Sequence, residues 1–259
     1  MAKLPALLRS FEQSPQAYFR LGGVLYLGII VLGIFGELFV RGALVVPGDA
    51  LATANNISAA QFLWRCGIVG DLLMHIFDVP LIVIFYLLLR PINENLALWV
   101  SWITIVQTSV LVLNKLNLVL PILLLSDASY LGAIAIEQRH ALVLLAIKAH
   151  GFGFSIGLIF FGVACVVKGY LMLYADYFPK ALGVLFVLAG LSYLVNSTAL
   201  LLAPGVASLL FPWALIPAFI GELTVSLWMI IKGVNLRQWQ HALARSGFGI
   251  ELSTAQCEI

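Results

Sequence analysis

Two carboxylates and an imidazole interrupt an apolar stretch, residues 64–86, that is long enough to cross a bilayer. On a helix that turns about 100° per residue, Asp71, His75 and Asp78 fall within roughly 60° of one another. A charge in hydrocarbon costs about 2.5–3.5 kcal/mol on insertion scales, and residues retained at this cost commonly serve a function. Such a face can transfer protons to a substrate, bind a metal ion, or pair with basic groups on other helices.

Glu222 is a lone acid in another apolar stretch, near the C-terminal end of the chain. Burial favours the neutral form of such a carboxyl group, because an unpaired charge is costly in hydrocarbon. A protonated carboxyl can act as a general acid toward an alkene or epoxide of a lipid-like substrate, with Asp71 or Asp78 as the base. The alternative is a structural hydrogen bond to Asn196 or Lys115.

Two histidines on different apolar stretches, His75 and His150, could share a metal ion. With Asp78 or Glu222 they would form a mixed nitrogen and oxygen site of the zinc or iron type. The same pair could instead ligate haem b, since glycines beside His150 would leave room for the macrocycle. A third interpretation keeps each histidine as a hydrogen-bonded core residue. The cysteines lack the spacing of a thiolate metal site: Cys66, Cys165 and Cys257.

Further polar residues within the apolar stretches are candidates for the wall of a binding pocket. They are Glu37, Arg65, Asn114, Lys115, Asn117 and Asn196. The basic residues among them, and Lys148, are also available as ion-pair partners for Asp71 and Asp78, which would make the two acids structural. Gln107 is expected to join helices rather than to line a pocket.

The composition establishes an integral membrane protein. Of the 259 residues, 62% are hydrophobic and 10% are charged, whereas soluble domains have about 25% charged residues. An amphipathic lead-in (1–20), an all-α transmembrane domain (21–232) and a polar, mobile tail without a pattern (233–259) are expected. Residues 42–60 are expected to form a polar loop, with Ser58 as the N-cap of the next helix. The six predicted spans are 21–40, 62–89, 96–125, 140–167, 179–203 and 212–231.

Lysine and arginine are unequally distributed between the two ends of these helices, and an excess marks the cytoplasmic side. With Lys168 and Lys180 counted in the loop after the fourth helix, the excess lies on the side of both termini, which are therefore expected to be cytoplasmic. The polar residues of all six helices then fall into one slab, about 5–25 Å below the outer surface. This predicts a polar pocket that opens toward the outer side or outer leaflet and is closed below by apolar packing.

The best marked pieces of the chain are Val46-Pro47-Gly48-Asp49, Arg65 with Asp71, Leu89-Arg90-Pro91, and Gly221-Glu222-Leu223 with Trp228. In these pieces and in their order the chain resembles a bacterial family of membrane proteins, domain of unknown function 4386, and the resemblance covers most of its length. The resemblance implies a six-helix protein of the bacterial inner membrane and brings no established reaction. His75 and His150 depart from the family pattern, so the resemblance implies no histidine-based mechanism.

Three functions are compatible with these observations. The first is a protein that binds a small amphiphilic or isoprenoid-like molecule from the outer leaflet and can transform it by acid/base or metal-assisted chemistry. The second is a proton-coupled carrier, although the sequence shows no internal inverted repeat. The third is a structural or accessory subunit whose charges only fix helix packing. The net charge of +2 gives no indication of a nucleic-acid partner; membrane lipid is the expected partner, and the oligomeric state stays open.

Overall fold

The computed structural model describes residues 14–210 and 212–246, and every regular element within these residues is a helix. Six helical segments are long and apolar enough to cross a membrane. They are Pro15–Leu44, Gln61–Leu89, Glu94–Leu124, Ile136–Tyr174, Lys180–Leu202 and Trp213–Ile231. The predicted six-helix, all-α membrane fold is confirmed. The largest differences in helix bounds are the earlier start of the first span and the extension of the fourth to Tyr174.

Three spans are single helices: α5 (Gln61–Leu89), α8 (Ile136–Tyr174) and α9 (Lys180–Leu202). The first span joins α2 (Pro15–Ile34), the π-helical segment η1 (Phe35–Arg41) and α3 (Gly42–Leu44). The third joins α6 (Glu94–Asn114) and α7 (Leu116–Leu124), and the sixth joins η3 (Trp213–Leu215) and α11 (Ile216–Ile231). In the described part of the chain, four short helices lie outside the spans: α4 (Ala50–Ala59), η2 (Ser129–Ala133), α10 (Pro204–Leu210) and α12 (Leu236–Arg245).

Two segments outside the spans differ from the expectation. Residues 42–60 contain α4, whose N-cap is Asp49; its carboxylate accepts a hydrogen bond from the Ala52 amide at 2.9 Å. Ser58 therefore lies inside a helix and is not an N-cap. The expected polar tail contains α12, whose buried Trp239 packs edge-on against Phe19 with ring centroids 5.7 Å apart. The described part of the tail thus belongs to the folded domain, and residues 1–13 and 247–259 lie outside the described residues.

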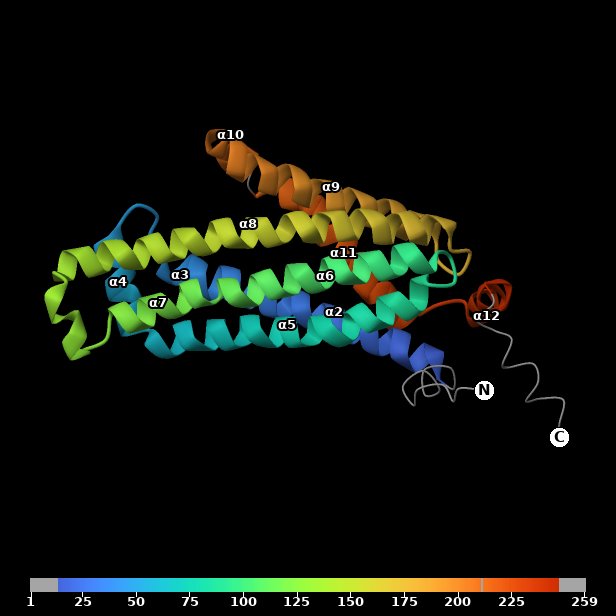
Figure 1. Ribbon diagram of the computed structural model, residues 1–259, viewed down its shortest axis with the longest axis horizontal. Coiled ribbons are helices and arrows are strands. Elements are labelled where there is room, and N and C mark those ends of the chain that lie inside the picture. Colours follow the sequence, from blue (N-terminus) through green and yellow to red (C-terminus); the bar gives the residue numbers. More distant parts are fainter. Residues whose placement is uncertain (1–13, 211, 247–259) are drawn as a thin grey trace.

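Helices α8 and α9 pack closely because glycines face each other along their interface. A Cβ added at Gly162 would lie 2.9 Å from the Gly190 carbonyl oxygen, and one added at Gly169 would lie 2.7 Å from that of Gly183. Small residues of this kind let two membrane helices approach backbone to backbone. The antiparallel register that they define places Leu202, at the end of α9, level with His150. The first part of α8 therefore extends about 21 Å past the end of α9, and Figure 1 shows α10 turning near the middle of α8.

Replacing Gly162 with valine is expected to destabilise the bundle by about 1–3 kcal/mol, since the added atoms would meet backbone rather than a flexible side chain. The same substitution at Gly151 is the matched control, because a Cβ there has no atom within 4 Å. Thermal unfolding of the purified protein in detergent measures the difference. Equal losses of stability in the two variants would contradict this account of the interface.

Two hydrophobic cores hold the bundle together. The first core lies at the end of the bundle that holds the start of α2 and the last residues of α8. It contains Phe19, Phe85 and Phe186. At that end the Tyr177 hydroxyl donates a hydrogen bond to the Leu88 carbonyl at 2.7 Å, and burial raises the pKa of this phenol, which lies outside the spans. The other core surrounds Trp64, whose indole N–H donates to the Leu118 carbonyl at 2.9 Å. The polar side chains of interest lie between these two cores.

Candidate functional site

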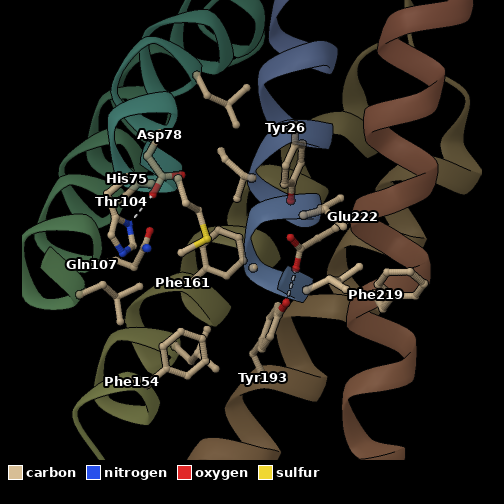
Figure 2. A pocket seen from close by; sticks show the side chains of 18 of the residues that line it. Tyr26, His75, Asp78, Thr104, Gln107, Phe154, Phe161, Tyr193, Phe219 and Glu222 are labelled. Atoms are coloured by element: carbon tan, nitrogen blue, oxygen red, sulfur yellow. Dashed lines mark hydrogen bonds and ion pairs between the residues drawn. The ribbon is translucent and has the colours of Figure 1, made fainter. Parts of the chain in front are cut away.

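A cavity of about 370 Å³ lies in the bundle, and every one of the six spans contributes side chains to its wall. Most of the wall is aliphatic or aromatic, and Figure 2 shows the polar side chains that project into it. Along α8 the wall runs from Phe154 to Lys168, which corresponds to about 21 Å of helix. The polar lining residues are Tyr26, Glu37, His75, Asp78, Thr104, Gln107, Lys168, Tyr193 and Glu222.

The first polar group of the wall is centred on Asp78 of α5. Its Oδ2 atom lies 3.2 Å from His75 Nδ1 and accepts a hydrogen bond from the Thr108 hydroxyl, also at 3.2 Å. Neither His75 Nε2 nor Gln107 Oε1 has a hydrogen-bond partner among the described residues, although both atoms are buried. A buried polar atom without a partner is costly, so this part of the wall offers a donor or acceptor position to a ligand.

The second polar group is centred on Glu222 of α11. The Tyr193 hydroxyl donates a short hydrogen bond to Glu222 Oε1. The Tyr26 hydroxyl points toward the same carboxyl group in Figure 2, and this buried hydroxyl has no geometric hydrogen-bond partner within the described residues. Glu222 and Asp78 therefore stand on opposite walls of one apolar cavity (Figure 2). Two acids so placed can act on the two ends of a reacting group.

The cavity reaches the outside of the bundle at the side rather than at the end. The lining residues that are exposed come from η1 and from the beginning of the sixth span: Glu37, Leu38, Pro212 and Phe219. Leu38 is 64% exposed and Phe219 is 46% exposed. Because Leu38 and Phe219 are apolar and lie on membrane-spanning segments, the opening faces lipid.

Asp71 belongs to a separate ion-pair network and does not line the cavity. Its Oδ2 atom accepts hydrogen bonds from Arg41 Nη1 and Lys115 Nζ, each at 2.9 Å. Arg41 Nε also donates a hydrogen bond to Glu37 Oε2 at 2.8 Å. Asp71 and Lys115 are almost completely buried. Phe154, part of the cavity wall, lies against the Lys115 ammonium. Of the three interpretations of Asp71, which were proton transfer, metal binding and ion pairing, the structure shows the ion pair.

The other expected pocket residues lie away from the cavity. Asn114 donates a hydrogen bond to the His150 carbonyl at 2.9 Å and accepts one from Asn117 at 2.9 Å, which joins α6 to α8. Arg65 is exposed. Asn196 is buried on α9 but is not part of the wall. Gln107, expected to join helices, lines the cavity instead.

The histidines do not form the anticipated centre. The His150 ring stacks on Phe154, with centroids 6.2 Å apart, and it is absent from the cavity wall that contains His75. Within the described residues, no group of three or more His, Cys, Asp or Glu side chains is placed to hold a metal ion. The mixed nitrogen and oxygen metal site expected from both histidines with Asp78 or Glu222 is therefore not formed among the described residues.

Comparison with known proteins identifies the family to which this chain belongs. The family model described as domain of unknown function 4386 matches residues 21–233. The chain belongs to this family. A protein of Archaeoglobus fulgidus described as uncharacterised is 28% identical over 171 residues, which cover 66% of this chain and 86% of that protein. No solved structure matches the chain significantly.

Five polar residues that line the cavity in this member of the domain of unknown function 4386 family were not expected there: Tyr26, Thr104, Gln107, Lys168 and Tyr193. Tyr26 and Tyr193 carry hydroxyls that frame Glu222, but tyrosines in apolar helices give no distinct sequence signal. Lys168 was counted as a loop cation, whereas it lies inside α8 and is 5% exposed. The continuation of the apolar pattern to Tyr174 could have revealed its position.

Proposed function

We propose that this protein binds a small amphiphilic or isoprenoid-like molecule in the cavity and transforms it by acid/base chemistry. One observation carries the proposal: an apolar cavity shared by all six spans holds carboxyl groups on opposite walls and opens toward lipid. Its volume of about 370 Å³ lies within the range of about 300–1,000 Å³ that is typical of small-molecule sites. The ligand enters from the outer leaflet between η1 and the sixth span.

The acid and base have distinct surroundings. Glu222, with the hydroxyl of Tyr193 as its neighbour, is the general acid that donates a proton to an alkene or epoxide of the ligand. Asp78 is the base that takes a proton from the other end of the reacting group, and His75 and Thr108 orient its carboxylate. Asp71, by contrast, has both of its cationic partners in place and serves packing.

The packing at the end of the cavity favours a binding or catalytic role over a proton-coupled carrier. The core around Phe19, Phe85 and Phe186 closes the bundle beyond Tyr26. Protons that reach Glu222 from the lateral opening would have to cross this core to leave on the far side. We also propose that the protein lies in the inner membrane of a bacterium, with the end of the bundle that holds the start of α2 and α12 (Figure 1) on the cytoplasmic side.

The test is deuterium exchange into a bound isoprenoid in heavy water. With farnesol as the probe, the wild-type protein is expected to exchange hydrogens beside the double bonds, and Glu222→Gln to lower this rate by about 10²-fold or more, as loss of a general acid does. Glu137→Gln is the control, because Glu137 is exposed and far along α8 from the cavity. Exchange that is equal in the two variants would overturn the role of Glu222. A Glu222→Gln protein that binds no farnesol and unfolds at a lower temperature would show a structural role instead.

A further inference from the structure

Lys168 carries an amino group that lines the cavity without a fixed partner. The side chain is 5% exposed, and Nζ lies over the rings of Phe85 and Phe161, at 5.0 and 5.9 Å from their centroids. The structure shows no hydrogen bond or ion pair between this nitrogen and any described residue. Since Cβ atoms of a helix tilt toward its N-terminus, the side chain runs back along α8 into the bundle instead of out to the membrane surface.

The other buried lysine of the spans is held quite differently. Lys115 Nζ pairs with Asp71 Oδ2 at 2.9 Å, and Lys115 does not line the cavity. An ammonium fixed in an ion pair has no lone pair with which to attack a ligand. An unpaired charge in an apolar site is costly, whereas a neutral amine carries no such cost. A lysine in an apolar pocket is the usual setting for imine chemistry.

Acids line the same cavity as Lys168. Asp78 and Glu222 both line the wall and interact electrostatically with Lys168, but neither forms an ion pair with it. They can therefore move protons during a condensation and balance the charge of its product. The remaining ionisable lining groups are His75, which binds Asp78, Glu37, which binds Arg41, and the phenols of Tyr26 and Tyr193 near Glu222.

We propose that Lys168 is a carbonyl-reactive residue that binds an apolar aldehyde as an imine. This inference rests on the proposed function and names the substrate class of the same cavity. The neutral amine attacks the carbonyl carbon, and one proton of the attacking nitrogen is transferred to the carbonyl oxygen, which gives a neutral carbinolamine. Glu222 or Asp78 protonates the hydroxyl, which leaves as water while the C=N bond forms. No electrons are gained or lost, and the positive charge of the protonated imine is balanced by a carboxylate.

The position of Lys168 also orients the ligand. The aldehyde carbon must lie at the Tyr26 and Phe85 end of the cavity, and the chain extends toward the lateral opening beside Leu38 and Phe219. Since Asp78 and Glu222 lie across the cavity from each other (Figure 2), a chain on this path would pass between them. An unsaturated chain would thereby place its double bonds between the two acids of the proposed reaction.

The experiment uses the full-length protein in detergent, farnesal as the aldehyde probe, and sodium cyanoborohydride to reduce any imine to a stable amine. Peptide mass mapping is expected to find the adduct on Lys168, and Lys168→Arg to abolish it. Lys180→Arg is the matched control, because Lys180 is exposed at the start of α9 and its loss should leave the Lys168 adduct intact. An adduct spread over exposed lysines and unchanged in amount in Lys168→Arg would overturn the proposal.

A parallel titration with farnesol separates the two proposals, since farnesol has no carbonyl group. Binding of farnesol by the wild type and by Lys168→Met, without a trapped farnesal adduct in the wild type, would overturn imine formation and leave the cavity function standing. Absence of farnesol binding in both proteins, with both still folded, would overturn the proposed function itself. Farnesol binding together with a Lys168 adduct supports both.

Discussion

Replacing Asp71 with asparagine is expected to lower the free energy of unfolding by about 3–5 kcal/mol, the cost of breaking a buried ion pair on one side. The reason is that one oxygen of Asp71 receives both Arg41 and Lys115 at 2.9 Å, in a site from which water is excluded. The amide would leave the Lys115 ammonium buried and uncompensated, whereas Arg41 would keep Glu37. Denaturant or thermal unfolding of the purified protein in detergent measures the loss.

Two variants make this prediction specific. The double substitution Asp71→Asn with Lys115→Met removes the uncompensated charge and is expected to recover much of the lost stability. Asp49→Asn is the control for the chemical change itself, because asparagine caps a helix about as well as aspartate and the free energy should change by only a few tenths of a kcal/mol. An Asp71→Asn protein as stable as the wild type but unable to bind ligand would show that Asp71 acts in the site.

Replacing Gly33 with phenylalanine is expected to abolish ligand binding while keeping the fold. Gly33 lines the cavity, and a Cβ added there would have only Met74 Sδ near it, at 3.6 Å. The ring would therefore occupy ligand space rather than displace backbone. The affinity for farnesol is expected to fall by about 10²-fold, since the ligand would forfeit about 3 kcal/mol of apolar contact.

Gly151→Phe is the matched control for that experiment, because Gly151 is exposed on α8 and a Cβ there meets nothing within 4 Å. Farnesol titration and thermal unfolding are measured on both variants. If Gly33→Phe bound farnesol as the wild type does, the cavity would not be the binding site. If Gly33→Phe failed to fold, the smaller substitution Gly33→Leu is expected to bind farnesol more weakly than the wild type and Gly151→Phe do.

The spans could be predicted from the sequence because hydrocarbon leaves the chain few alternatives: long apolar segments must form helices there. The same reasoning failed outside the spans. Residues 50–59 are not apolar enough to be predicted as a membrane span, yet they form the helix α4, whose N-cap is Asp49. The segment after Lys232 looked featureless, although Trp239 and Leu243 form the buried face of α12.

The candidate site was only partly predictable. Asp78, His75, Glu222 and Glu37 do line one cavity. Asp71 shares a helix face with His75 and Asp78, but it lies about one turn closer to the start of α5 than His75 does, level with Lys115. Periodicity fixes the angle of a side chain about its own helix, not the rotation of that helix against its neighbours. The π-helical segment η1 changes this rotation locally, so that Arg41 reaches both Glu37 and Asp71.

The most direct measurement of the central claim is photo-cross-linking with a farnesol analogue that carries a diazirine. If the six spans share a ligand-binding cavity, labelled peptides from the wild type will contain lining residues such as Ile82, Leu158 and Phe161, and the labels will disappear in Gly33→Phe. Labels confined to exposed positions such as Val31, Leu145 and Val184, and unchanged by Gly33→Phe, would contradict it.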